Sequence, residues 1–198
     1  MNTLIDTGID QSIDYHRFVD EGLAKMGLRI ELITEEVMRK DIREFSTFIN
    51  DAFTEYYEIY KWRKHADDDY LLNPLTDKFK YSFCIRNLRD EIVFVDFSSV
   101  TDGMIDNHIV FTLKEYRGMN LAKYHIIKLS QVGLDNGYTK QIGYFSKKNK
   151  GSISLFVRMG YEISHIREDG LIIAYGDSET VLKNTYKMLT ESDNSPND

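Results

Sequence analysis

The segment 104–122 constrains the fold most, because a strand-like run passes directly through a short turn into a helix. The turn has the sequence EYRGMNLA (115–122), and the helix that follows is expected to end near Asn136. Such a junction leaves several backbone N–H groups without partners, and the helix dipole adds positive potential. Arg117 adds a full charge, and Gly118 lets the backbone approach a ligand closely. The junction is a candidate anion site, although many Arg–Gly junctions are purely structural.

The rest of the chain alternates between strand-like and helix-like patterns. Helical patterns follow Thr34, a capping residue, and Asn149, whose helix is expected to end at Gly160. The first of these helices carries one apolar stripe at helical spacing, formed by Ile42, Phe45, Ile49 and Phe53. Strand-like runs cover 28–34, 81–88, 91–100, 104–113, 138–146, 162–167 and 171–176. We therefore predict a mixed α/β fold, with a central, mostly antiparallel sheet of about seven strands flanked by helices.

The chain of 198 residues is long enough for one domain with a sizeable core. We assign this domain to 28–180, an N-terminal arm or short helix to 1–27, and a C-terminal extension with a disordered tail to 181–198. There is no run of about 18 apolar residues and no signal-peptide pattern, so we expect a soluble, cytoplasmic protein without a membrane partner. The net charge of −7 argues against nucleic-acid binding.

Cys84 is the only cysteine, so the chain has no internal disulfide. Potential metal ligands show no recognisable spacing, and we expect no metal site. Within the run YSFCIRN, we interpret Cys84 as a small core residue in preference to a nucleophile.

The sequence YRGMNLAKYHIIKL (116–129) resembles the pyrophosphate-binding motif R/Q-x-x-G-x-G/A of the GNAT N-acetyltransferase superfamily. Arg117 and Ala122 match its first and last positions, whereas Asn120 replaces the middle glycine. Asparagine tolerates unusual backbone angles better than other residues that carry a side chain.

A second stretch, NKGSISLFVRMGYE (149–162), resembles the next motif of that family. The motif places an asparagine at a helix start, then a small residue, an aromatic residue and Gly-Phe/Tyr, and it is matched in order by Asn149, Ser152, Phe156, Gly160 and Tyr161. The resemblance covers about three-quarters of the chain and implies the GNAT acyl-CoA N-acyltransferase fold.

The resemblance also implies a cofactor site for acetyl-CoA or another acyl-CoA, without a metal. The strands 104–113 and 138–146 would splay apart and hold the pantetheine arm, with main-chain contacts from Phe111, Thr112 and Leu113. Asn149, Ser152 and Phe156 would complete the site on the following helix. The pyrophosphate would lie on the turn formed by Arg117, Gly118, Met119, Asn120, Leu121 and Ala122.

Acyl transfer to an amine needs a base near the splay, and relatives of this kind use a carboxylate there. Asp106 and His108 lie on one face of the preceding strand and are the candidate bases, directly or through a water. Alternatively, Asp106 belongs to a turn and His108 is an ordinary strand residue. Phe156 stands where many relatives have a tyrosine that protonates the departing thiolate, and we expect the nearby Tyr144 and Tyr161 to pack in the core.

The aromatic stretch 54–72 is where such proteins build the acceptor site. Tyr57, Tyr60 and Trp62 could form a wall for an amine or a sugar, although an amphipathic helix followed by a solvated acidic loop is the simpler interpretation of the stretch. We expect an N-acyltransferase for a small-molecule amine or amino sugar. The alternatives are a protein or peptide N-acetyltransferase and a non-catalytic acyl-CoA sensor. The sequence is also compatible with a homodimer.

Overall fold

The protein is built around one sheet of seven strands, in a computed structural model that describes residues 10, 12–56, 65–73 and 75–191. The order across the sheet is β1-β2-β3-β4-β5-β7-β6. Every neighbouring pair is antiparallel except β4 and β5, which are parallel. The strands are β1 (Leu28–Leu32), β2 (Phe83–Asn87), β3 (Ile92–Thr101), β4 (Met104–Thr112), β5 (Lys140–Ser146), β6 (Tyr161–Ile166) and β7 (Leu171–Asp177). The predicted mixed α/β fold with a mostly antiparallel sheet is confirmed.

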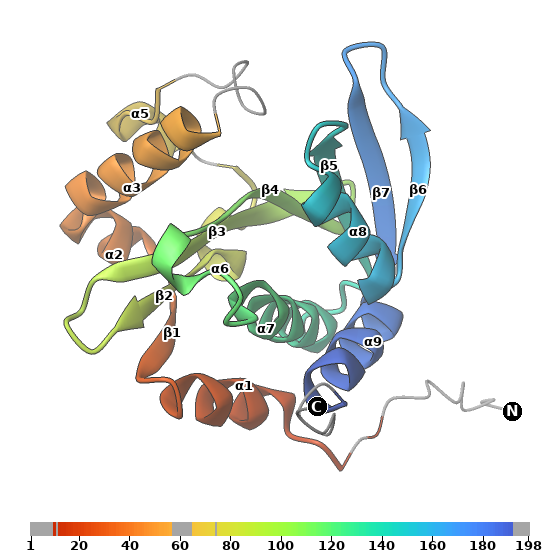
Figure 1. Cartoon of the computed structure of the whole chain (residues 1–198). Coiled ribbons are helices and arrows are strands. Elements are labelled where there is room, and N and C mark those ends of the chain that lie inside the picture. Colours follow the sequence, from red (N-terminus) through yellow and green to blue (C-terminus); the bar gives the residue numbers. More distant parts are fainter. Residues whose placement is uncertain (1–9, 11, 57–64, 74, 192–198) are drawn as a thin grey trace, which may run out of the picture.

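Helices cover both faces of the sheet (Figure 1). On one face α1, α7 and α9 lie together, and their apolar side chains form a core with β1 and β3. On the other face α2, α3 and α5 share a second core with β3 and β4. A third core joins α8 to β5, β6 and β7 and includes Ile126 of α7 and Val181 of α9. The helices are α1 (Tyr15–Ala24), α2 (Glu35–Lys40), α3 (Ile42–Glu55), α5 (Asp68–Leu71), α6 (Lys78–Tyr81), α7 (Leu121–Asp135), α8 (Lys150–Met159) and α9 (Ser178–Thr190).

The predicted helix after Thr34 is interrupted once. Thr34 caps α2 as expected, because its Oγ1 accepts a hydrogen bond from the N–H of Val37 at 3.1 Å. The helix then breaks at Asp41, and α3 carries the predicted apolar stripe onward. The carboxylate of Asp41 accepts a hydrogen bond at 2.6 Å from the guanidinium of Arg86, which is 2% exposed and also binds Glu44. This buried cation holds the break in place.

The helix that follows Asn149 begins and ends where the sequence predicts. The side chain of Asn149 accepts a hydrogen bond from the N–H of Ser152 at 3.3 Å and so caps α8. Gly160 ends α8 with a φ of 106°, a left-handed conformation that glycine adopts without strain.

The aromatic stretch is only partly described. Tyr57, Tyr60 and Trp62 lie outside the described residues. Further along, Asp67 accepts a hydrogen bond from the N–H of Tyr70 at 2.9 Å and caps the short helix α5. This aspartate therefore has a structural role at a helix start.

Cys84 is fully buried in β2, in the core between the sheet and α3. Burial raises the pKa of its thiol to about 12, so the thiolate that would act as a nucleophile is scarce at neutral pH. The prediction of a core cysteine is confirmed.

Lys78 in α6 is a buried lysine and gives a testable pH dependence. It is 4% exposed, its Nζ donates to the Leu71 carbonyl oxygen at 2.5 Å, and burial lowers its pKa from 10.5 to about 8. Between these two values the unfolded chain binds more protons than the folded one, so the free energy of unfolding rises with pH in that window. Below about pH 8 the buried amine of the folded protein is protonated, and the desolvation of its charge lowers the free energy of unfolding by its full amount.

We expect Lys78→Met to raise the free energy of unfolding by about 1–2 kcal/mol near pH 7, since the desolvation cost exceeds the lost hydrogen bond. The gain should shrink as the pH approaches about 10. Urea unfolding near pH 7 and near pH 10 measures the change in the free energy of unfolding. Lys80 is an exposed lysine of the same helix, and Lys80→Met serves as the control. Equal destabilisation of the Lys78 variant at both pH values contradicts the assignment.

Candidate functional site

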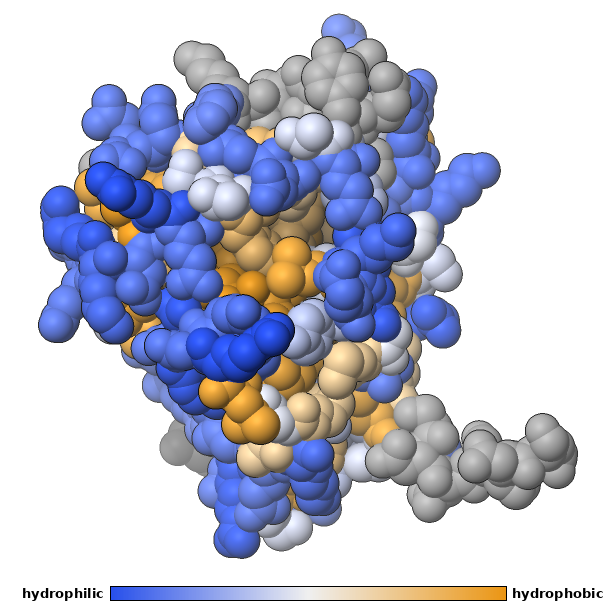
Figure 2. Space-filling model, turned by 60° about the vertical axis from the view of Figure 1, so that its left-hand side comes forward, coloured by the Kyte–Doolittle hydropathy of each residue, from blue (hydrophilic) through white to orange (hydrophobic). Residues whose placement is uncertain are grey.

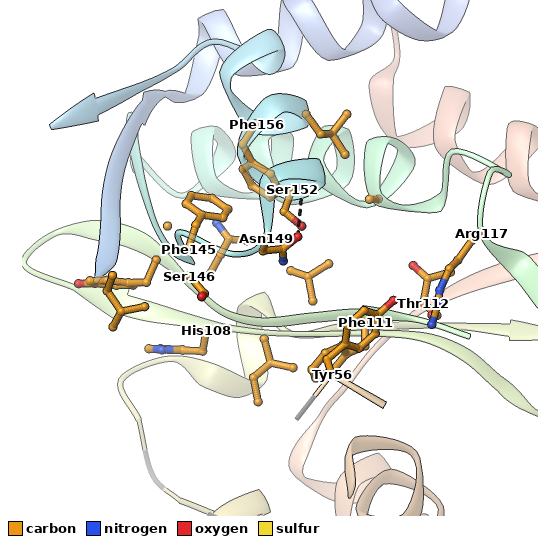
Figure 3. A pocket seen from close by; sticks show the side chains of 18 residues that line it. Tyr56, His108, Phe111, Thr112, Arg117, Phe145, Ser146, Asn149, Ser152 and Phe156 are labelled. Carbon is orange, nitrogen blue, oxygen red and sulfur yellow. Dashed lines mark hydrogen bonds between the residues drawn. The ribbon is translucent and has the colours of Figure 1, made fainter. Parts of the chain in front are cut away.

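The two parallel strands β4 and β5 pair over three positions only. These are Ile105 with Gln141, Asp106 with Ile142 and Asn107 with Gly143. Beyond them the strands diverge, and a cavity of about 220 Å³ lies between them, next to α8 (Figure 3). In Figure 2, one face of the molecule shows a hollow with an apolar floor and a hydrophilic surround, which matches the mixed lining of this cavity.

A β-bulge in β4 marks the point of divergence. Phe97 of β3 pairs with Ile109 and Ser98 pairs with Asn107, so His108 is an extra residue on the β4 side. A bulge bends its strand and re-aims the side chain it carries. The bulge thus accounts both for the departure of β4 from β5 and for the direction of His108.

His108 lines the cavity and makes close contacts with two buried residues. Its Nε2 lies 2.6 Å from Ser99 Oγ, and its Nδ1 lies 3.6 Å from Asp106 Oδ1. Asp106 is 3% exposed and does not itself line the cavity. A carboxylate beside Nδ1 favours the proton on that nitrogen, which leaves Nε2 to accept from the serine hydroxyl.

Seven of the predicted cofactor residues line the cavity, and they come from β4, from the turn and start of α7, and from the region of α8. They are Phe111, Thr112, Arg117, Ala122, Asn149, Ser152 and Phe156. Figure 3 shows His108 toward one end and Arg117 at the other, with Asn149, Ser152 and Phe156 on the opposite side from β4. An elongated ligand could therefore reach from a charged end to an imidazole.

The other predicted cofactor residues do not line the cavity. Leu113, Met119 and Leu121 pack into the apolar cores on either side of the sheet. Gly118 and Asn120 form the turn itself, both with positive φ, 84° and 61°. Asn120 thus adopts the left-handed backbone conformation of the glycine that it replaces in the motif.

The turn before α7 offers hydrogen-bond donors. Within the described residues, the N–H groups of Gly118, Asn120, Leu121 and Ala122 donate to no protein acceptor. They lie at the N-terminus of a 15-residue helix, where the dipole favours negative charge. This donor set fits a phosphate or pyrophosphate.

Arg117 is held in place by the end of α3. Its Nη1 and Nη2 donate to the two carboxylate oxygens of Glu55, each at 2.7 Å, and this contact lowers the pKa of that carboxyl group. The guanidinium lies 5.1 Å from the ring centre of Tyr56, which stacks on Phe111 at 6.2 Å and 17°. Glu55 therefore occupies the guanidinium edge that a phosphate would use.

Solved structures with this arrangement are numerous. The fold is similar to an acetyltransferase from Streptococcus agalactiae (TM-score 0.61, 14% identity, 77% of this chain and 99% of that one). It is also similar to a GNAT-family acetyltransferase from Staphylococcus aureus (TM-score 0.60, 15% identity, 76% and 99%). A third is the PaiA N-acetyltransferase from Thermoplasma acidophilum in complex with coenzyme A (TM-score 0.54, 8% identity, 76% and 98%). The chain has the GNAT fold.

Sequence comparison alone gives no such result: no protein-family model matches the chain, and no curated protein matches it significantly. At 8–15% identity the GNAT likeness rests on the arrangement of helices and strands. Within the described residues, no group of three or more His, Cys, Asp or Glu side chains is placed to hold a metal ion. None of the described helices has the length and apolar character needed to cross a bilayer.

On the α7 side of the splay, this GNAT fold has a buried polar network. Tyr161 is 2% exposed, and its hydroxyl donates to Gln141 Oε1 at 2.6 Å. His125 and Asp96 are fully buried, 3.1 Å apart, and Ser98 Oγ donates to Asp96 at 2.8 Å. From the α7 side of the sheet, this network stabilises the ends of β4 and β5 that pair with each other. It also confirms that Tyr161 packs in the core.

Four site residues escaped the sequence analysis or were misplaced by it. Tyr144 was expected in the core, yet it is half-buried and lines the cavity. The alternation of side chains along β5 could have shown this, because Tyr144 lies on the opposite face from the core residue Phe145. Glu55 and Tyr56 belong to the stretch predicted for the acceptor site, yet they contact Arg117 at the cofactor end. Like Ser99, each reaches its place only through tertiary contacts.

Proposed function

We propose that this protein is an acyl-CoA-dependent N-acyltransferase, with acetyl-CoA as the donor and a small-molecule amine as the acceptor. The observation that carries the proposal is the cavity between the diverging β4 and β5. At one end it has Arg117 and four N–H groups that donate to no acceptor in the described part of the chain, and His108 lies toward the other end. This distribution of polar groups matches an acyl-CoA, whose pyrophosphate would lie at the end with Arg117 and whose thioester would lie near His108.

The residues at the phosphate end support the proposal through their charge and backbone geometry. The turn from Gly118 to Ala122 would bind the pyrophosphate through N–H groups, and Arg117 would add charge-assisted hydrogen bonds. Phe111 and Thr112 of β4 would pair with the pantetheine arm through main chain, and Asn149 and Ser152 would contact the arm from α8. Beyond Asn107, β4 has no strand partner on its β5 side within the described residues, and this is the edge along which the arm would lie.

At the other end, His108 would remove the proton from the acceptor ammonium. Asp106 would orient the ring and stabilise its charged form, and Ser99 would hold Nε2 until a water or the amine takes its place. The amine nitrogen then attacks the carbonyl carbon of the thioester, and strand N–H groups stabilise the negative charge that develops on oxygen. No covalent enzyme intermediate is needed.

For the acceptor, a small cationic amine or amino sugar fits the acidic balance of the chain, with a net charge of −7 and a carboxylate beside His108. Tyr57, Tyr60 and Trp62 stay the proposed acceptor wall, in the part of the chain that the structure leaves undescribed. A peptide amine is the alternative acceptor. The cytoplasmic location and the homodimer stay predictions.

A non-catalytic acyl-CoA sensor is the second candidate function, and one observation favours it: Phe156 has no hydroxyl to protonate a thiolate. Thiol release from acetyl-CoA over a panel of a polyamine, an amino sugar and a peptide with a free alanine amino group separates the two. We expect amine-dependent release with one of the small amines. Binding of acetyl-CoA without release over the whole panel would make the chain a sensor.

Glu55 should weaken acyl-CoA binding because it competes with phosphate for Arg117. We expect Glu55→Gln to tighten acetyl-CoA binding about threefold to fivefold, a modest change because both side chains are partly exposed. Titration calorimetry measures it, with Glu115→Gln as a control for general charge. The gain should shrink in an Arg117→Ala background, and a gain of equal size there would contradict competition.

A further inference from the structure

The proposed reaction needs a proton donor for the departing sulfur. Cleavage of the carbon–sulfur bond leaves a thiolate, and protonating it as it forms lowers the barrier. Phe156 of α8 lines the cavity, but its hydrocarbon ring packs on Phe145 and Tyr161 with centroid distances of 4.8 and 4.9 Å. The proton must come from another side chain at the cavity or from water.

Two tyrosines line the cavity within the described residues, Tyr56 and Tyr144. Tyr56 lies at the phosphate end, stacked on Phe111 and under the guanidinium of Arg117. Tyr161 is excluded because its hydroxyl is buried and donates to Gln141. Tyr144 is the remaining phenol.

The strand register places Tyr144 at the apex of the splay. Gly143 is the last residue of β5 that pairs with β4, and Tyr144 follows it directly. Ile142 lies opposite Asp106, and directly opposed residues share a face of the sheet. Because side chains alternate along a strand, Tyr144 shares that face with Ile142 and hence with the Asp106–His108 pair.

We infer that Tyr144 is the general acid of this site and protonates the sulfur as coenzyme A departs. The inference rests on the proposed acyl transfer. It assigns a catalytic role to a residue of β5 in a chain whose α8 carries phenylalanine at the cavity wall.

The surroundings of Tyr144 keep its hydroxyl protonated until it is used. Its pKa is raised, first by partial burial and then by the negative charge of Asp106. The other charged or titratable groups that act on the phenol are Tyr175, Arg167 and Asp102. A raised pKa means that the phenol carries its proton throughout the neutral range, as a general acid must before the reaction.

The proton balance closes within the site. The ammonium gives one proton to His108, which passes it to solvent. The amine nitrogen then forms the new carbon–nitrogen bond and loses a second proton to His108, and the carbon–sulfur bond breaks with its electron pair on sulfur. Tyr144 gives its proton to that sulfur and becomes a phenolate. The phenolate is then reprotonated by solvent or by the His108–Asp106 pair on the same face, and the net products are an amide, free coenzyme A and one proton.

Tyr144→Phe tests the inference, with Tyr138→Phe, just before β5, as a matched control. We expect Tyr144→Phe to lower kcat about 100-fold while the KM for acetyl-CoA stays within about twofold, because only the proton transfer is lost. Tyr138 does not line the cavity and packs against Tyr81, so its variant should retain the kcat of the natural protein.

A second variant separates a catalytic hydroxyl from a packing role. Incorporating 3-fluorotyrosine at position 144 preserves the ring but lowers the phenol pKa, so the alkaline limb of the pH profile of kcat should move to lower pH. An unmoved limb, or Tyr144→Phe with unchanged kcat, overturns the inference and leaves the acyltransferase standing. If the natural protein binds acetyl-CoA but transfers to no amine, the proposed function fails as well.

Discussion

Replacing His108 with glutamine is expected to lower kcat by about 100-fold or more, with the affinity for acetyl-CoA changed by less than about twofold. Glutamine retains a polar side chain of similar reach but cannot accept and release a proton near neutral pH. The imidazole faces the cavity, contacts Ser99 and lies 3.6 Å from the Asp106 carboxylate, so its loss removes the base itself. Steady-state kinetics with the best amine of the panel, together with calorimetry, measures both quantities.

Asp106→Asn distinguishes the roles of the two residues. Asp106 is buried and does not line the cavity, so we expect its variant to lose no more activity than the His108 variant. His165→Gln, an exposed histidine of β6, serves as the control and should behave like the natural protein. A larger loss with Asp106→Asn than with His108→Gln would reverse the assignment and make the carboxylate the base that meets the amine.

Replacing Arg117 with alanine is expected to weaken acetyl-CoA binding about tenfold and to leave the binding of acetyl-pantetheine unchanged. A hydrogen bond to a charged group contributes about 1.5–3 kcal/mol, and each 1.4 kcal/mol is tenfold in affinity. The lower end applies because Arg117 must first give up its bidentate contact with Glu55. Acetyl-pantetheine has no pyrophosphate, so its affinity should not change.

Calorimetry with both ligands measures the Arg117 effect, and Arg39→Ala is the matched control. Arg39 forms the same kind of ion pair with Glu35, on α2, and does not line the cavity. Its variant should bind both ligands normally. An equal loss of affinity for acetyl-CoA and acetyl-pantetheine in Arg117→Ala would mean that Arg117 supports the shape of the cavity without binding the pyrophosphate.

Much of the fold could be predicted because its signals are local. Alternation and composition located the seven strands, and the caps at Thr34 and Asn149 depend on residues three positions apart in the chain. The left-handed turn at Asn120 follows from the tolerance of that residue for positive φ. Two motifs within 50 residues then indicated the GNAT fold, which the structure confirms.

The details that organise the site could not be predicted, because they depend on tertiary contacts. The break at Asp41 is held by Arg86, which is 45 residues away, and Glu55 meets Arg117 across 62 residues. The bulge at His108 is defined only by the register of β3 against β4. The periodicity of one segment cannot predict such contacts between distant segments.

The central claim is that the turn before α7 binds the pyrophosphate of an acyl-CoA, and hydrogen–deuterium exchange tests it directly. The N–H groups of Gly118, Asn120, Leu121 and Ala122 have no protein acceptor in the described residues, so they should exchange rapidly in the free protein. Saturating acetyl-CoA should protect peptides that contain them, whereas peptides from β6, whose residues lie away from the cavity, should stay unchanged. Protection of the turn supports the account, and acetyl-CoA binding that leaves the turn unprotected would contradict it.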